Sequence, residues 1–198
     1  MGIAVFGGTF DPIHIGHLII AEQAYNHCEL DSIIFMPAGI PPHKDENNVS
    51  GKNYRLEMVK LATADNDHFD YSQLELVKEG DSYTVNTLQE MQSIYPGQKI
   101  FFLIGADSLL DIYNWKQPEY LLENARFIVA RRPGFLLKDV FLDERFRKYR
   151  ENIKILENSL IDISSTQIRE LCFNEKSIKY LVPPVIVNYI KTNGLYRE

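Results

Sequence analysis

The sequence predicts an α/β fold in which a doubly wound parallel sheet carries a small helical C-terminal end. Apolar runs of strand length alternate with stretches of helical periodicity, and this alternation is typical of right-handed crossovers between parallel strands. The run KIFFLI at Lys99–Ile104 has consecutive apolar positions, as expected for a strand covered on both faces. With 198 residues, 45% of them hydrophobic and 24% charged, the chain is expected to form one domain over residues 1–198.

The strands and helices are expected in a regular order. The predicted strands are Ile3–Phe6, Ser32–Met36, Tyr71–Val77, Lys99–Ile104, Arg126–Ala130 and Ile153–Leu156. The predicted helices are His14–Cys28, Tyr54–Thr63, a segment after an N-cap at Ser82, Asp139–Tyr149, and two that begin at Ser165 and Pro184. The C-terminal helical portion is expected from about residue 164. In Rossmann-like sheets of this kind ligands bind beyond the carboxyl ends of the strands, so we expect a site in the loops that follow them.

Charge and cysteine content exclude several classes of protein. The formal net charge is −6, which makes the chain a poor candidate for sequence-independent binding of nucleic acid, so we expect no nucleic acid as a partner. No apolar segment approaches the length of a membrane span, and the first residues do not resemble a secretory signal, so a cytoplasmic location is expected. Cys28 and Cys172 are far apart in the sequence, which argues against a disulfide framework and against a cysteine-based zinc site.

The loop after the first predicted strand, GGTFDPIHIGH at Gly7–His17, carries the strongest functional pattern. Two adjacent glycines let the backbone approach a ligand, and the following helix start offers free N–H groups and the positive end of a dipole to phosphate. His14 and His17 are three residues apart, so both imidazoles lie on one helix face and can contact one anion. Without an acidic or cysteine partner the two histidines make a poor zinc site, so the pattern favours phosphate.

A second pattern lies near the other end of the chain. Ser164–Thr166 form a predicted helix start, and Arg169 follows one turn later, where its guanidinium can bind phosphate oxygens. Together, GGTFDPIHIGH and ISSTQIR (Ile163–Arg169) resemble the two signatures of the HxGH nucleotidylyltransferase superfamily. The segments PPHK, SYTVNTL and GAD, with Trp115, are similar to those of bacterial nicotinate-mononucleotide adenylyltransferases, and this resemblance spans nearly the whole chain.

The resemblance implies an enzyme of NAD biosynthesis that joins ATP and nicotinate mononucleotide into deamido-NAD and releases diphosphate. The catalytic residues it implies are His14, His17, Lys44 and Arg169. The ATP-binding residues it implies are Gly7, Gly8, Thr9, Phe10, Gly105, Asp107, Ser164, Ser165 and Thr166. The residues it implies for nicotinate mononucleotide are Thr84, Trp115, His43 and Tyr113. No residue is assigned to a metal, and Mg²⁺ is expected to arrive on the phosphates of ATP.

Some of these residues also fit a structural role. Asp107 would serve equally as the N-cap of a helix at Ser108–Asp111, and Trp115 as a core residue rather than a stacking platform for the pyridine ring. His43 fits an ordinary loop position, and Tyr113 is a similar case.

Two kinds of alternative remain beside this activity. A sister adenylyltransferase would act on nicotinamide mononucleotide or pantetheine phosphate, whereas a non-catalytic module would only sense a nucleotide. The histidines and Arg169 favour an enzyme, because a sensor needs no clamp for a leaving group. The expected partners are ATP and nicotinate mononucleotide, and a homo-oligomer is left open.

Overall fold

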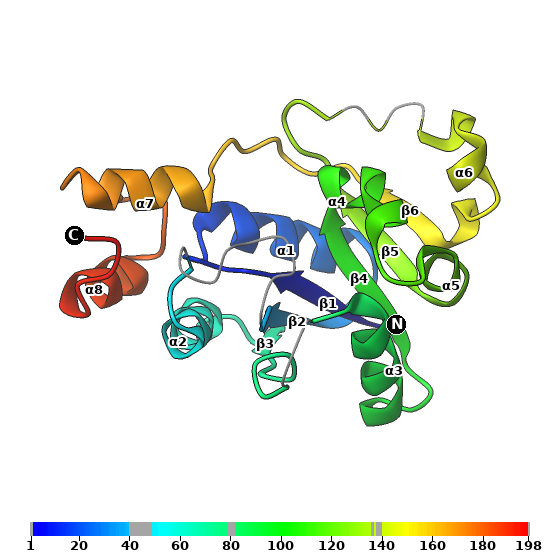
Figure 1. Ribbon diagram of the computed structural model, residues 1–198, viewed down its shortest axis with the longest axis horizontal. Helices are drawn as coiled ribbons and strands as arrows, with labels where there is room; N and C mark the ends of the chain where they lie inside the picture. The colour runs from blue at the N-terminus through cyan, green and yellow to red at the C-terminus, as the bar shows by residue number, and fades with distance from the viewer. Residues whose placement is uncertain (1, 40–48, 79–81, 136, 138–139, 198) are drawn as a thin grey trace.

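One parallel sheet organises the protein. The computed structural model describes residues 2–39, 49–78, 82–135, 137 and 140–197. Within them, six strands pair in the order β3-β2-β1-β4-β5-β6, and all neighbouring pairs are parallel (Figure 1). The strands are β1 (Gly2–Gly8), β2 (Leu30–Pro37), β3 (Phe69–Tyr71), β4 (Lys99–Gly105), β5 (Arg126–Ala130) and β6 (Ile153–Leu156). This is the doubly wound order with its switch point between β1 and β4, so the predicted fold class is confirmed.

Helices cover both faces of the sheet. They are α1 (Ile15–His27), α2 (Lys52–Thr63), α3 (Thr84–Ile94), α4 (Ala106–Leu110), α5 (Pro118–Asn124), α6 (Glu144–Arg147), α7 (Ser165–Phe173) and α8 (Pro184–Thr192). In β1, Ile3 and Val5 pack into a core cluster with α3, α4, α5 and α6, whereas Ala4 and Phe6 pack with α1, α2, α7 and α8. Burial on both faces explains why the strands appear in the sequence as continuous apolar runs.

The C-terminal helices lie at one end of the molecule. Figure 1 shows α7 and α8 beside each other there, with α5 and α6 at the opposite end. α8 also contacts α2, so the last helix packs against the first half of the chain. The expected boundary at about residue 164 falls just before α7, and its status as the start of a separate portion stays a prediction.

The third strand is shorter and earlier than the sequence indicates. β3 covers Phe69–Tyr71, so the prediction of a strand at Tyr71–Val77 is wrong beyond its first residue. The Ser72 N–H donates to the Phe35 carbonyl at 2.9 Å, and the chain then turns away from the sheet. Leu76 lies in this turn and its side chain is buried. Its burial explains why the apolar residues of this segment resemble those of a strand.

The start of α3 also differs from expectation. The helix begins at Thr84 with Tyr83 as its N-cap, so the prediction of an N-cap at Ser82 is wrong. The Ser82 hydroxyl instead accepts the Gly39 N–H at 3.2 Å. This hydrogen bond joins the residues before α3 to the segment that follows β2. Serine before a helix usually caps that helix, whereas here its hydroxyl serves a distant segment.

The region before β6 is less helical than predicted. In place of one helix over Asp139–Tyr149, the described residues form a 3₁₀ turn at Val140–Leu142 and the single-turn helix α6. Asp143 caps α6 by accepting the Arg145 N–H, which starts a new helix where the predicted one would continue. The sequence expectations also omit α5, although its first residue, Pro118, suits a first helical turn.

Candidate active site

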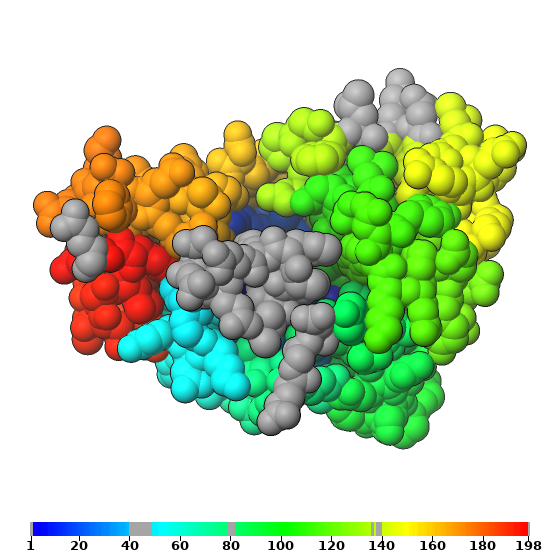
Figure 2. All heavy atoms as spheres, in the orientation of Figure 1, coloured from blue at the N-terminus to red at the C-terminus, as the bar shows by residue number. Residues whose placement is uncertain are grey.

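Two adjoining cavities lie at the carboxyl ends of β1 and β4. The first, here called the Trp115 cavity, has a volume of about 580 Å³, and the second, the histidine cavity, about 320 Å³. Both are lined by Phe6, Gly7, Ile104, Gly105, Asp107 and Ser108. Figure 2 shows the blue N-terminal residues at the bottom of a hollow between α7 and the green middle of the chain. The cavities therefore occupy the switch point of the sheet, where this fold binds ligands.

The histidine cavity contains both imidazoles of the GGTFDPIHIGH loop. His14 is the N-cap of α1 and His17 lies in its first turn, and their rings stack with centroids 3.6 Å apart. His17 Nδ1 accepts the His14 N–H at 3.2 Å, so a neutral His17 carries its proton on Nε2. The glycine between them leaves room for this packing, because a Cβ on Gly16 would lie 3.1 Å from the His14 ring, which is a tight contact. The spacing thus builds a paired-imidazole surface.

Both histidines are uncharged at neutral pH in this environment. Burial, and then the positive charge of Arg132, lowers the pKa of His14 from 6.5 to about 4. Burial, with His14 and Arg132 as further causes, also lowers the pKa of His17 well below its usual value. His14 Nδ1 is buried and has no hydrogen-bond partner among the described residues. The two rings therefore offer polar atoms to a ligand without a permanent charge of their own.

Asp107 stands where the two cavities meet. It lies in the first turn of α4, whose N-cap is Gly105, so the alternative of an Asp107 N-cap is wrong. One carboxylate oxygen accepts from Arg132 Nη1 at 2.8 Å, while Oδ1 is buried without a partner among the residues described. A Cβ on Gly105 would lie 2.3 Å from that Oδ1, so glycine is needed for the carboxylate to fold back over the strand end.

Arg132 is a site residue that the sequence reasoning missed. It follows β5, lines the histidine cavity beside His14 and His17, and has a side chain 47% exposed. Its position after a strand that neighbours β4 is a signal that could have found it, because ligands bind at such strand ends.

The second signature meets the first. Ser164 is the N-cap of α7, where its hydroxyl accepts the Gln167 N–H at 3.1 Å, and it lines the histidine cavity. The Ser165 hydroxyl donates to the Pro12 carbonyl at 2.9 Å. Arg169 Nη1 donates to the Asp11 carbonyl at 2.9 Å. The start of α7 therefore lies against the loop that carries the two histidines, and that both bind one ligand stays a prediction.

The Trp115 cavity is built from a second set of segments. Thr84 brings the N-terminus of α3 to it, and Gly8 and Thr9 bring the loop after β1. Trp115 is half-buried, packs against the adjacent core cluster and lines the cavity as well. Its position is compatible with both expected roles, and stacking on the pyridine ring stays a prediction. Glu75 lies in the same wall and accepts the Thr87 hydroxyl proton at 2.7 Å. Burial raises the pKa of Glu75.

Some candidate residues lie elsewhere. Phe10 is 2% exposed and packs edge-on against His17, so its side chain belongs to the core. Tyr113 packs on Phe146, and its hydroxyl donates to the Arg145 carbonyl at 2.8 Å. Thr166 is exposed and accepts a long 3.4 Å contact from Arg169. His43 and Lys44 lie outside the described residues.

Cavity size alone does not identify the site. A hollow of about 680 Å³ beside α8 is larger, but it reaches the loop of residues 7–17 through Ile15 alone. Within the described ranges, no group of three or more histidine, cysteine, aspartate or glutamate side chains is placed to hold a metal ion. None of the described helices is long and apolar enough to cross a membrane.

Comparison with known proteins identifies the family of the chain. The chain belongs to the cytidylyltransferase-like family, whose model matches residues 5–171. It is 43% identical over 196 residues to the probable nicotinate-nucleotide adenylyltransferase of Clostridium tetani, covering 98% of both chains. It is 44% identical to the protein of the same name from Moorella thermoacetica, covering 98% of this chain and 91% of the other. Within the family it therefore falls with the nicotinate-nucleotide adenylyltransferases.

A solved structure shares the fold. The nicotinic acid mononucleotide adenylyltransferase of Plasmodium falciparum, complexed with NaAD, superposes with a TM-score of 0.83. The match covers 98% of this chain and 96% of the other. Because the sequence identity is 22%, it shows that the two proteins share a fold and no more.

Proposed function

We propose that this protein transfers the adenylyl group of ATP to nicotinate mononucleotide, giving deamido-NAD and diphosphate. One observation carries the proposal: the paired histidines and the start of α7 line a cavity that adjoins a second one at Asp107, walled by Trp115. Two adjoining cavities suit two nucleotides whose phosphates must meet. The curated relatives carry the name of this activity, and the Plasmodium structure contains the dinucleotide NaAD.

The reaction is a displacement at phosphorus. A phosphate oxygen of nicotinate mononucleotide forms a bond to the α-phosphorus of ATP, and the bond from that phosphorus to the bridging α–β oxygen breaks. Diphosphate leaves with the electron pair. The attacking phosphate is already an anion near neutral pH, so the protein's contribution is to position the two nucleotides and to stabilise the charge of the departing group.

Each part of the histidine cavity has a role in this proposal. The Nε2–H of His17 donates to a phosphate oxygen, and the His14 imidazole beside it contacts the same group. The positive ends of α1 and α7 face the triphosphate in this proposal, although the Ile15 N–H at the start of α1 donates to the Leu181 carbonyl at 2.9 Å. Asp107, with one buried oxygen free of hydrogen bonds among the described residues, accepts from a ribose hydroxyl. Arg169 stays a prediction for binding the β- and γ-phosphates, and its Nη1 also donates to the Asp11 carbonyl of the loop.

The Trp115 cavity is proposed to bind nicotinate mononucleotide. Trp115 provides a face for the pyridine ring, and the N–H groups at the start of α3, beginning with Thr84, favour the carboxylate of the acid over a neutral amide. His43, Lys44 and Tyr113 stay predictions for substrate contact, although the hydroxyl of Tyr113 is engaged elsewhere.

ATP is proposed to enter as its Mg²⁺ complex, with the ion held by phosphate oxygens and water, as suits a hard cation. Within the described residues, the carboxylates and histidines form no cluster of three for such an ion. The cytoplasmic location and a homo-oligomeric state stay predictions.

A side-by-side turnover assay tests the proposed function. The purified protein is given MgATP with nicotinate mononucleotide, nicotinamide mononucleotide or pantetheine phosphate, and diphosphate release is measured. We expect release with nicotinate mononucleotide at a higher kcat/KM than with either alternative. Binding of ATP without turnover of any of the three would support the sensing module instead, and a preference for pantetheine phosphate would contradict the role given to the Trp115 cavity.

A further inference from the structure

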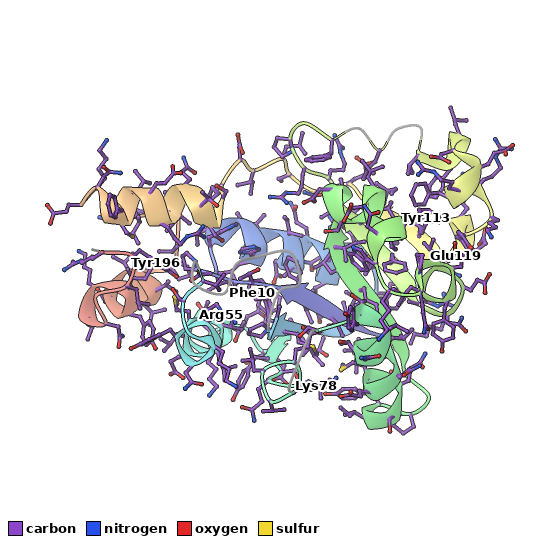
Figure 3. All side chains as sticks on the ribbon, in the orientation of Figure 1. Phe10, Arg55, Lys78, Tyr113, Glu119 and Tyr196 are labelled. Carbon is purple, nitrogen blue, oxygen red and sulfur yellow. The ribbon has the colours of Figure 1, made fainter. Side chains whose placement is uncertain are left out.

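Arg55 is the most heavily hydrogen-bonded buried cation near the candidate site. It projects from α2 and is 2% exposed. Its guanidinium donates to four backbone carbonyls: Ser50 at 3.0 Å, Thr9 at 2.9 Å, Ala38 at 2.8 Å and Gly39 at 3.1 Å. One side chain thus joins the loop after β1 to the segments on either side of residues 40–48. Figure 3 shows Arg55, Phe10 and Tyr196 approaching one another from α2, this loop and the end of the chain.

The contact with Thr9 fixes the orientation of a peptide group. In a trans peptide the C=O and the following N–H point in opposite directions. Because the Thr9 carbonyl faces the guanidinium, the Phe10 N–H is turned away from Arg55. A loop that binds phosphate through its backbone depends on which way such N–H groups point. Arg55 therefore fixes the direction of the Phe10 N–H, which the flexible glycines of the loop would leave variable.

Asp11 and Tyr196 complete the same network. The Asp11 carboxylate is 2% exposed and accepts the Tyr196 hydroxyl at 2.7 Å and the Ser50 N–H at 3.2 Å. Ser50 thus binds Asp11 through its N–H and Arg55 through its carbonyl, so a buried anion and a buried cation share one peptide segment. Only two residues follow Tyr196 in the sequence, yet its hydroxyl is bonded to the Asp11 carboxylate in the loop after β1.

We infer that Arg55, Asp11 and Tyr196 are positioning residues that hold the backbone of residues 9–11 in the orientation that receives the triphosphate of ATP. The inference rests on the proposed function, through the assignment of this loop to ATP. None of the three needs to touch a substrate. They act by restricting the loop before ATP arrives, so that less ordering is required on binding. The C-terminal residues of the chain thereby belong to the ATP site.

The test uses Tyr196→Phe, which removes one hydroxyl and keeps the ring. Tyr189→Phe is the matched control, because Tyr189 is also half-buried near the C-terminus and its hydroxyl has no hydrogen-bond partner among the described residues. Binding of MgATP is measured by calorimetry, and KM for each substrate by diphosphate release. For Tyr196→Phe we expect the Kd and KM for ATP to rise about three- to tenfold, the effect of one lost hydrogen bond. We expect KM for nicotinate mononucleotide to change less than twofold, and Tyr189→Phe to match the wild type.

Arg55→Lys provides a second, independent measurement. Lysine keeps the charge but lacks the planar fork that serves four carbonyls, so we expect a larger rise in the Kd for MgATP than with Tyr196→Phe. Melting temperatures are recorded for all variants, and binding is measured at a temperature where each is folded. The inference is overturned if both variants melt earlier but bind MgATP as the wild type does, since that pattern describes a purely structural network. A wild type that binds MgATP without turning over nicotinate mononucleotide would instead count against the proposed function alone.

Discussion

Acidification should destabilise this protein through the buried histidine pair. His14 has a folded-state pKa of about 4, lowered from 6.5 first by burial and then by Arg132. Between these two values the unfolded chain binds a proton at this position and the folded chain does not. The contribution of His14 to the free energy of unfolding is therefore fully present above pH 6.5 and is lost as the pH falls toward 4. His17 acts in the same direction, since its pKa is also lowered.

The size of the effect follows from the two pKa values. At pH 5 the unfolded His14 is almost fully protonated and the folded one about one-tenth protonated, which corresponds to a loss of about 2 kcal/mol relative to pH 8. For a chain of this length that is a fall in Tm of about 4–8 °C. Glu75 works in the opposite sense, because burial raises its pKa, so the wild-type slope alone does not isolate His14.

The comparison that isolates it uses variants. Urea unfolding of the wild type and of His14→Asn is measured at pH 8, 7, 6 and 5, and the difference between the two free energies is plotted against pH. We expect the wild type to lose about 2 kcal/mol more than the variant over this range. His27→Asn, at the exposed last turn of the same helix, is the control and should follow the wild type. Parallel curves for the wild type and His14→Asn would refute the burial of a neutral His14.

Three substitutions test the roles proposed for the cavities. His17→Ala should lower kcat for diphosphate release at least about 100-fold while the protein remains folded by circular dichroism, and normal turnover would exclude a phosphate role. Trp115→Ala should raise KM for nicotinate mononucleotide about tenfold and KM for ATP little. Equal changes in the two KM values would indicate that Trp115 is only a core residue. Asp107→Asn breaks a half-exposed ion pair with Arg132, so it should cost less than about 1 kcal/mol of stability. Its KM for ATP should rise, and an unchanged KM would leave Asp107 structural.

Local patterns in the sequence were sufficient to predict the strands and helix starts around the candidate site. Apolar runs predicted five of the strands, because burial on both faces leaves that pattern in the residues themselves. The spacing of His14 and His17 predicted a shared helix face, and the structure has the two rings stacked. The serines before Arg169 predicted a helix start, and Ser164 is its N-cap. Each of these inferences depends on residues within one or two turns of each other.

What the sequence could not supply are contacts between distant segments. Ser82 was predicted as a cap because its neighbours are helical, but its hydroxyl serves Gly39, 43 positions earlier. Nothing near Arg55 indicates that its guanidinium binds four carbonyls, and nothing near Tyr196 indicates a partner 185 positions away. Phe10 follows two glycines in a phosphate-binding pattern, yet its ring fills the core beneath that loop. Such roles are set by the packing of elements.

These long-range contacts explain how a chain of net charge −6 can receive a triphosphate. Among the described residues, the two arginines that line the histidine cavity are paired, Arg132 with Asp107 and Arg131 with Glu157. Nearby, Arg169 donates to a loop carbonyl and Arg55 to four others. The histidines are held uncharged by burial. In the proposed function, helix termini and backbone N–H groups whose directions the arginines fix add to the attraction for the ligand. Fixed dipoles need no reorganisation when the substrate arrives, whereas a cluster of unpaired cations would repel one another in its absence. The arginines that serve the loop thus matter most for where they point the backbone.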